Sequence, residues 1–234
     1  MERIQKILSD RGVASRRQGE QWIKEGRVTC NGTVCVLGDQ ADADRDTILV
    51  DGKPLPAPAA YTYIMLHKPR GYVTTLSDEK GRKTVAELTQ DCGVRVYPVG
   101  RLDMDSEGLL LLTNDGEFAN RLMHPSHQVE KVYRVWVRDF SPEGLEKLKK
   151  PITLDGYRIR PPKVRLVEDS GILEITICEG RNRQVRRMCD AAGMKVTRLI
   201  RVQEGALSLG NLPVGKWRNL TKKEVEILSV YRKS

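Results

Sequence analysis

Apolar residues near the start of the chain follow a helical period. Within residues 4–8 they are spaced i, i+3 and i+4, and Gly12 ends the pattern. Ser15 then precedes Gln18 by three residues, which is the spacing of a capping box at a helix N-terminus. The pattern predicts two short helices, the second running to about residue 25, where Gly26 provides a C-cap.

Short alternating segments follow these helices. Residues 27–30 and 33–36 flank Asn31-Gly32, which predicts a hairpin with a type I′ turn, and residues 47–50 form a further strand. Three prolines between residues 54 and 58 then indicate a linker, because proline stiffens the backbone and removes N–H donors. The chain is therefore predicted to consist of a domain at residues 1–58 and a second at residues 59–234.

The second domain mixes strands with a few helices and shows no internal repeat or regular βαβ alternation. The pattern predicts strands at residues 63–67, 95–99, 109–113, 132–137, 173–178 and 195–202. It predicts helices at residues 117–123, 145–150 and 183–192. We therefore expect an α+β fold around a mixed, mainly antiparallel sheet.

Charge adds a binding preference to this fold. Lys and Arg number 40 against 31 Asp and Glu, which gives a net charge of +9 and favours a polyanionic partner. Residues 1–27 hold seven basic and four acidic residues, whereas residues 28–60 hold two and five. The two first helices therefore either present a basic face to phosphates or form an ordinary solvated pair.

Several classes of protein are excluded by the same composition. The longest aliphatic run, residues 109–112, is far too short to span a bilayer, and the first residues lack a hydrophobic signal core. We therefore expect a cytoplasmic protein. Five cysteines without a Cys-x-x-Cys spacing predict reduced thiols and no metal site. No Gly-rich phosphate loop is present, so no cofactor is predicted.

Two segments offer chemistry. Asp103, Asp105, Glu107 and Asp115 lie within thirteen residues, close to Arg101, and an arginine keeps a neighbouring carboxylate ionised for work as a nucleophile or base. The same acids also suit ordinary turns, and spacing alone does not single one out. Residues 181–202 hold seven basic residues and one acid, partly on an amphipathic helix, which favours phosphate contact.

The first fifty residues resemble the α-L RNA-binding domain. The resemblance rests on two helices joined by Gly-Val-Ala-Ser-Arg-Arg at residues 12–17, followed by Gly-Arg-Val and an Asn-Gly turn. It implies a structured RNA as partner, with Arg16 and Arg17 on the RNA-facing surface.

The rest of the chain resembles the ribosomal pseudouridine synthases of the RsuA type. The motifs that carry the resemblance are Gly-Arg-Leu-Asp at residues 100–103 with residues 106–116, Lys-Pro-x-Gly at 68–71, Glu-Lys-x-Tyr at 130–133, residues 179–188 and residues 212–221. Members of this family detach uracil from the ribose at N1, turn it and rejoin it through C5, without a metal or nucleotide cofactor. The resemblance therefore implies a pseudouridine synthase catalytic domain acting on a flipped base.

The resemblance also assigns roles to particular residues. Three residues are expected to be catalytic. Asp103 is the catalytic aspartate, Arg186 pairs with it and holds it charged, and Tyr133 stacks on the target base and takes part in proton transfer, the alternative for Tyr133 being an ordinary core strand tyrosine. Arg101 is expected to fill the space that the base leaves, while Asp105 keeps only a turn role. Leu199 or Ile200 would supply an apolar pocket wall. The remaining residues expected to bind RNA are Lys68, Arg181, Arg183 and Arg187.

The target and the alternatives stay open at this level. Ribosomal RNA, or an assembling ribosomal subunit, is the implied partner of a monomeric protein, and the large subunit is favoured over the small one. A non-catalytic protein for RNA binding or ribosome assembly would use the same scaffold. A magnesium-dependent nuclease using Asp103, Asp105 and Asp115 is a third reading.

Overall fold

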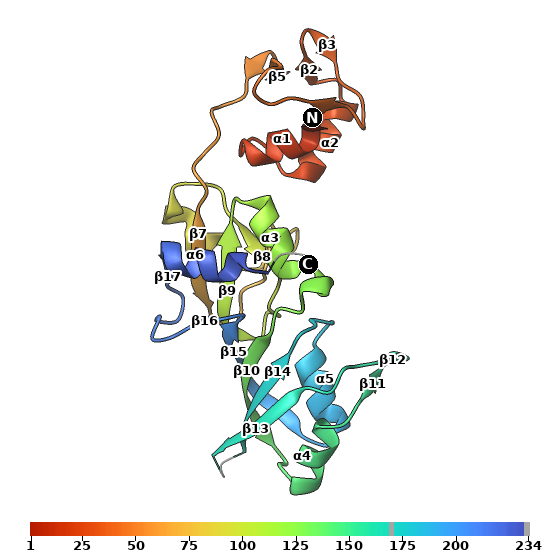
Figure 1. The fold of residues 1–234 in the computed structure, drawn as a ribbon, viewed down its shortest axis with the longest axis vertical. Coiled ribbons are helices and arrows are strands. Elements are labelled where there is room, and N and C mark those ends of the chain that lie inside the picture. The colour runs from red at the N-terminus through yellow and green to blue at the C-terminus, as the bar shows by residue number, and fades with distance from the viewer. Residues whose placement is uncertain (169–170, 232–234) are drawn as a thin grey trace. The chain divides into compact units, whose positions relative to one another are not determined.

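A computed structural model of the chain describes residues 1–168 and 171–231 (Figure 1). Contacts between residues divide it into two units, one made mainly of residues 1–62 and the other of most of the remaining chain. Residues 55–62, which contain the boundary predicted at residue 58, have no regular secondary structure. Lys53 and Pro54, expected in the linker, instead form a short strand, β6 (Lys53–Pro54).

The N-terminal unit consists of two helices and short strands around its own core. The helices are α1 (Ile4–Asp10) and α2 (Arg16–Lys24). The strands are β1 (Glu2–Arg3), β2 (Val28–Cys30), β3 (Thr33–Val34), β4 (Gln40–Ala41) and β5 (Ile48–Val50), together with β6. Strands β3, β2, β5 and β6 form one antiparallel sheet in that order, and β1 pairs with β4.

Local signals in the sequence explain these elements. The Ser15 side chain accepts a hydrogen bond from the Gln18 amide at 3.1 Å, which caps α2 as predicted. Asn31 and Gly32 both have positive φ, at 51° and 83°, which fits the predicted type I′ hairpin. The apolar stripe of α1 is buried against Ile23 and Val28. The predicted helices and hairpin of this unit are therefore confirmed.

The second unit is built on one large mixed sheet. Its strands are β7 (Tyr63–Lys68), β8 (Tyr97–Val99), β9 (Glu107–Thr113), β10 (Lys131–Arg138), β13 (Lys163–Glu168), β14 (Ile172–Ile177), β15 (Lys195–Glu204), β16 (Leu207–Ser208) and β17 (Trp217–Asn219). The main order is β13-β14-β10-β15-β9-β7-β17, with β16 beside β15 and β8 beside β9. Among the described strands only β9 and β15 pair in parallel. The predicted mixed, mainly antiparallel sheet is therefore confirmed.

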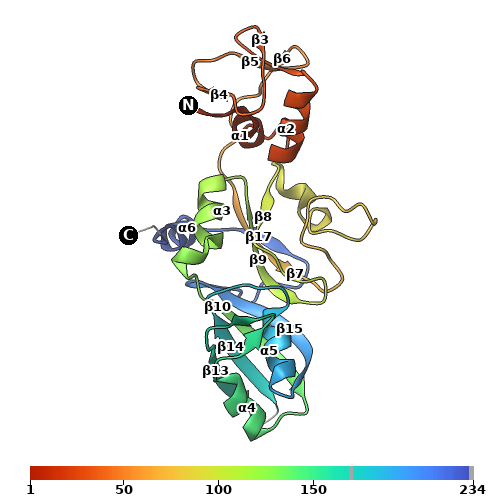
Figure 2. The ribbon, with the colours of Figure 1, turned by 90° about the vertical axis from the view of Figure 1, so that its right-hand side faces the viewer.

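Helices cover the two ends of this sheet. They are α3 (Gly116–Met123), α4 (Pro142–Leu148), α5 (Gln184–Ala191) and α6 (Lys222–Ser229), with short 3₁₀ turns η1 (Glu87–Cys92) and η2 (Pro125–His127). Helices α3 and α6 lie beside β7 to β9, whereas α4 and α5 lie beside β10 and β13 to β15 (Figure 2). A small hairpin of β11 (Thr153–Leu154) and β12 (Tyr157–Arg158) projects next to α5.

The parallel contact between β9 and β15 depends on a glycine. Gly108 has a φ of +113°, and a Cβ atom placed there would lie 2.2 Å from the Arg201 carbonyl oxygen. Any other residue would therefore push the two strands apart. Because β9 and β15 approach so closely here, they connect the two halves of the sheet.

The sequence pattern missed some elements. Helix α6 was not predicted, although Thr221 and Glu224 form a complete capping box at its start. Strands β13 and β17 at the two edges of the sheet were also not predicted. Within the described residues no helix is long and apolar enough to cross a membrane, and none of the five cysteines forms a disulfide.

Candidate active site

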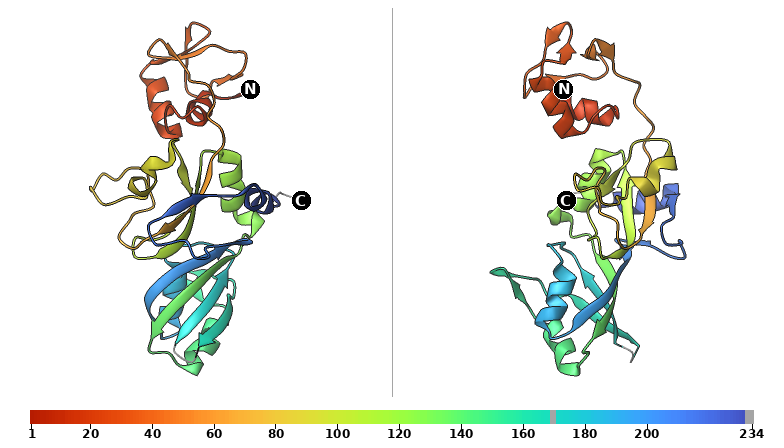
Figure 3. Two further views of the ribbon diagram at one scale, coloured as in Figure 1. Left: turned by 90° about the vertical axis from the view of Figure 1, so that its left-hand side faces the viewer. Right: turned by 180° about the vertical axis from the view of Figure 1, so that it is seen from behind.

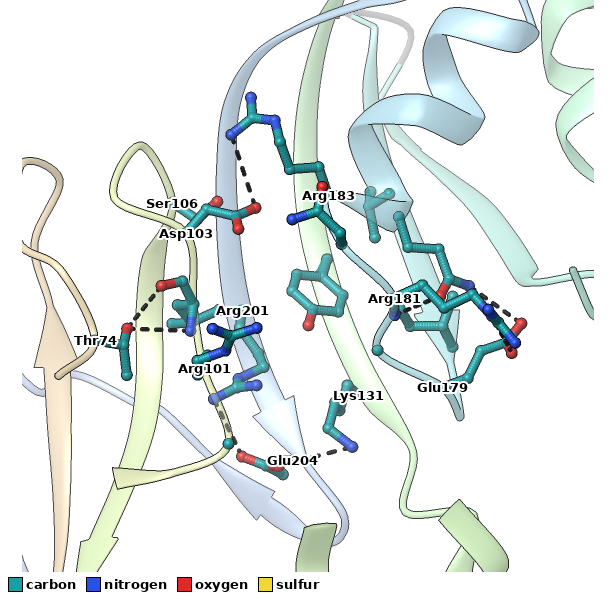
Figure 4. A pocket seen from close by; sticks show the side chains of 18 of the residues that line it. Thr74, Arg101, Asp103, Ser106, Lys131, Glu179, Arg181, Arg183, Arg201 and Glu204 are labelled. Atoms are coloured by element: carbon teal, nitrogen blue, oxygen red, sulfur yellow. Dashed lines mark hydrogen bonds and ion pairs between the residues drawn. The ribbon is translucent and has the colours of Figure 1, made fainter. Parts of the chain in front are cut away.

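A pocket of about 990 Å³ opens in the second unit (Figure 4). It is enclosed by the segment 100–106 before β9, by β10 and β15, and by the segment 179–183 before α5. Three of the residues that the sequence motifs singled out, Asp103, Tyr133 and Arg183, come from these separate segments and line it. The fold therefore brings distant motifs to one cavity.

The strand wall of the pocket follows from the register of two strands. Tyr133 lies opposite Arg201 and Val135 opposite Leu199 in the β10–β15 pair. Because side chains alternate along a strand, Leu199 and Arg201 line the pocket, while Ile200 packs into the core on the other face. Leu199 thus occupies the predicted wall position, and the alternative of Ile200 is corrected.

The loop wall, residues 100–106, is held by a buried lysine. The Lys68 ammonium donates to the carbonyl oxygens of Pro69, Asp103 and Ser106 at 3.1, 2.9 and 2.9 Å. Thr74 adds a hydroxyl bond of 2.7 Å to the carbonyl of Leu102. Lys68 is 0% exposed, so the prediction that it contacts RNA is wrong. Its three donors shape the loop that carries Asp103.

The carboxylate of Asp103 remains accessible. Its side chain is 35% exposed, and its Oδ2 lies 3.9 Å from Nη1 of Arg183, a contact visible in Figure 4. That distance is longer than a hydrogen bond, so Arg183 does not hold the carboxylate tightly. Asp103 is therefore open to a ligand in the pocket.

Asp105 is held much more firmly than Asp103. Arg183 donates two hydrogen bonds of 2.9 Å to its two carboxylate oxygens. Arg186 donates to the Asp105 main-chain oxygen at 2.9 Å, and its Nε lies 3.4 Å from Oδ2. Hydrogen bonding from Arg183, the main cause, lowers the pKa of Asp105 below its usual value. The predicted pairing of Arg186 with Asp103 is therefore corrected, and Asp105 has more than a turn role.

The inner end of the pocket holds a buried polar network. Arg201 donates to the Leu109 carbonyl at 2.7 Å and lies 3.3 Å from Glu204, which is 3.8 Å from the Lys131 ammonium. Tyr133 lies opposite Arg201 in the β10–β15 pair and so adjoins this network. Sequence reasoning gave no role to Glu204 or Lys131, although the Glu-Lys-x-Tyr motif already marked Lys131. It counted Arg201 among the basic residues expected to favour phosphate contact, but Arg201 is only 1% exposed.

Burial determines how this network is charged. It raises the pKa of Tyr133 above 10.0, so that the phenol stays protonated at neutral pH. Burial also opposes the charge on Arg201, but attraction to Glu204 and Tyr133 outweighs it and raises the pKa of the guanidinium. The pocket therefore combines an accessible carboxylate on its loop wall with a phenol that stays protonated on its strand wall.

The other predicted RNA-binding residues are distributed unequally. Arg101 is exposed and lines the pocket, and Arg181 lines it while stacking over Tyr157. Arg187 is not in the pocket, because it forms a two-pronged ion pair with Asp155 at 2.7 and 2.6 Å. Arg16 and Arg17 are exposed at the start of α2 in the N-terminal unit.

Comparison with known proteins places this pocket in a family. A family model described as RNA pseudouridylate synthase matches residues 62–191, and an S4 domain model matches residues 2–42. The chain belongs to the RNA pseudouridylate synthase family and carries an S4 domain. It is therefore an isomerase that converts uridine in RNA to pseudouridine, as its motifs predicted.

Individual relatives resemble the chain over nearly its whole length. It is 44% identical to ribosomal large subunit pseudouridine synthase B of Bacillus subtilis, covering 97% of this chain and 96% of the relative. It is 46% identical to an uncharacterized RNA pseudouridine synthase of Aquifex aeolicus, covering 95% and 92%. A crystal structure of a pseudouridylate synthase, 31% identical, matches with a TM-score of 0.71 and covers 97% of this chain and 100% of that one.

Proposed function

We propose that this protein isomerises a specific uridine of large-subunit ribosomal RNA, with Asp103 as its catalytic aspartate. The observation that carries the proposal is the accessible Asp103 carboxylate, which lies in one pocket with Tyr133 and Arg183. Relatives that match almost the full chain are named for the large ribosomal subunit. The small subunit is the alternative target.

The geometry supports a role for each wall of the pocket. A uridine enters only after it leaves its base stack, and we assign to Arg101, which is exposed and lines the pocket, the role of filling the vacated space. The uracil then lies against Tyr133 and Leu199. The N1–C1′ bond breaks, the ring turns, the C5–C1′ bond forms, the C5 proton passes to a base, and N1 takes up a proton, so that the atoms of uridine are conserved.

An ionised Asp103 serves each of three routes through this reaction. It can attack C1′, add to the uracil ring or remove a sugar proton, and all three require the carboxylate form. Arg183 lies 3.9 Å from that carboxylate. The protonated Tyr133 offers a flat surface for the base.

The S4 domain supplies RNA docking in this proposal. Its helix α2 presents Arg16 and Arg17 to solvent, and we assign the docking domain to residues 1–58 and the catalytic domain to residues 59–234. Such an enzyme works where ribosomes are assembled, in keeping with a cytoplasmic location. The monomeric state and the absence of a cofactor stay predictions.

Two alternatives lack this support. A nuclease would need Asp103, Asp105 and Asp115 at one metal ion, but Asp105 is bound by Arg183 and Arg186. A non-catalytic assembly protein would not need an accessible carboxylate in the pocket.

The test is to map pseudouridines in ribosomal RNA from a strain lacking this protein. The same strain is complemented with the wild type or with Asp103→Asn. We expect one or a few large-subunit pseudouridines to disappear, to return with the wild type, and to stay absent with the variant. Loss confined to the small subunit would support the alternative target. An unchanged map would overturn the proposed enzyme.

A further inference from the structure

The β11–β12 hairpin carries an aromatic residue at the edge of the pocket. The hairpin projects from the body of the unit beside α5 (Figure 3). Tyr157 lines the pocket and is 43% exposed, so that part of its ring is accessible at the pocket edge.

Several contacts hold the hairpin in place. Its turn residues Asp155 and Gly156 have φ of 51° and 75°, as in a tight hairpin. Arg187 of α5 fixes Asp155 through the two-pronged ion pair. At the other end, Ile159 is buried and its amide donates to Ile152 at 2.8 Å. Tyr157 is therefore presented from a hairpin anchored at both ends.

Arg181, in the segment 179–183 before α5, packs against the ring of Tyr157. Its guanidinium lies 3.3 Å from the centre of the Tyr157 ring, in a cation–π stack. Both residues line the pocket, and Arg181 is exposed. Its Nε also lies 3.8 Å from a Glu179 carboxylate oxygen, and a guanidinium stacked by its face directs its other N–H groups sideways, where they can meet phosphate oxygens. The pair thus combines flat π surfaces with phosphate donors.

We propose that Tyr157 and Arg181 form a second nucleotide site, which stacks the base next to the flipped uridine and contacts its phosphate. Flipping removes one base from the stack and exposes the face of its neighbour. Aromatic rings and guanidinium planes replace such lost stacking in RNA complexes. The site rests on the proposed function, because it needs an RNA strand entering the pocket.

The test uses full-length protein and a large-subunit ribosomal RNA transcript labelled with [5-³H]uridine. Pseudouridine formation releases the C5 tritium to water, so that kcat and KM are measured directly. We expect Tyr157→Leu to raise KM about tenfold with kcat within about twofold, because stacking affects strand binding. Tyr157→Phe keeps the ring and stays within about twofold of the wild type.

Substitutions of Arg181 separate stacking from charge. Arg181→Lys keeps the charge and should raise KM while leaving the salt dependence of binding unchanged. Arg181→Gln should also make the log–log salt slope shallower by about one unit. Thr153→Ala, in the same hairpin but without an aromatic ring, is the control and should match the wild type.

The outcomes distinguish the two proposals. A wild type that releases tritium, with Tyr157→Leu unchanged in KM, overturns the stacking site alone. A loss in Tyr157→Phe equal to that in Tyr157→Leu, or a loss in kcat alone, also overturns it. A wild type that releases no tritium overturns the proposed function and this site with it.

Discussion

The two walls of the pocket are positioned in different ways. The strand wall, with Tyr133, Leu199 and Arg201, takes its geometry from the β10–β15 register, which many main-chain hydrogen bonds maintain. The loop wall, residues 100–106, takes its position largely from a few side chains that reach its main chain, Lys68 above all. The residue expected to carry the chemistry is thus on the wall with fewer supports.

This difference has consequences for substitution. Many main-chain hydrogen bonds maintain the register of the strand wall. A single substitution there should therefore shift its side chains little. The loop wall concentrates its support in buried polar contacts, and leaving such groups unpaired costs about 1–3 kcal/mol each. Single substitutions should therefore reduce activity most when they affect the loop wall.

The largest effect is expected for the carboxylate itself. Asp103→Asn keeps the shape but removes the charge, so turnover should fall by at least about a thousandfold. RNA affinity should stay within a few fold, since Asp103 is not a phosphate contact. Single-turnover tritium release and filter binding measure the two quantities. Retention of more than a few per cent of the wild-type rate would remove Asp103 from its role.

Loss of the buried ammonium should come next. Lys68→Met leaves the carbonyls of Asp103 and Ser106 in the loop, and that of Pro69, without their donor. We expect the free energy of unfolding at pH 7 to fall by about 2–4 kcal/mol, and turnover to fall about a hundredfold with KM little changed. Urea unfolding and steady-state kinetics check this, with Lys80→Met, an exposed lysine, as control. Equal stability of both variants would contradict the support assigned to Lys68.

Lys68 also predicts a dependence of stability on pH. Burial lowers its pKa from 10.5 to about 8, against the attraction of Asp103 and other acids. Between pH 8 and 10.5 the unfolded chain therefore binds more protons at this site, and the wild type gains stability as pH rises. Lys68→Met lacks this gain, so the stability gap between the two should widen by at most about 3 kcal/mol. A constant gap would contradict the lowered pKa.

A smaller effect is expected for Asp105. Asp105→Asn removes the charge that Arg183 and Arg186 share, but Arg186 still donates to the main-chain oxygen. We expect about a tenfold loss of turnover. Asp190→Asn removes an exposed charge from the same α5 helix and should have no effect. Wild-type turnover in Asp105→Asn would show that this ion pair does not position the loop.

The smallest effect on turnover is expected for substitutions in the S4 domain. The double variant Arg16→Ala with Arg17→Ala should weaken RNA binding and reduce the log–log salt slope by about two units, with turnover at saturating RNA unchanged. The matched control is Arg45→Ala with Lys53→Ala, which removes the same charge from the acidic part of this domain. Equal effects of the two pairs would show that net charge alone is responsible.

The sequence predicted elements whose signals are local. Ser15 and the glycines after each helix act within a few residues, and the α1 and α2 bounds followed from them. The sequence of the edge strand β13 carries no comparable signal, because this segment becomes a strand by pairing with β14. The motifs also selected Asp103 and Tyr133, which the fold brings to one pocket.

The contacts inside the site could not be predicted in this way. Asp103 and Asp105 are two residues apart, and the path of the loop decides which of them faces Arg186. That path is set by Lys68, more than thirty residues earlier in the chain. A lysine in a Lys-Pro-x-Gly turn suggests an exposed cation, and only the tertiary structure shows it enclosed by carbonyl groups.

The most direct test of this account compares Asp103→Asn and Asp105→Asn on one labelled large-subunit transcript under single-turnover conditions. Both variants remove one negative charge from the same loop, two residues apart. The account predicts that Asp103→Asn is inactive while Asp105→Asn retains roughly a tenth of the wild-type rate. Equal rates for the two variants, or an inactive Asp105→Asn beside an active Asp103→Asn, would contradict it.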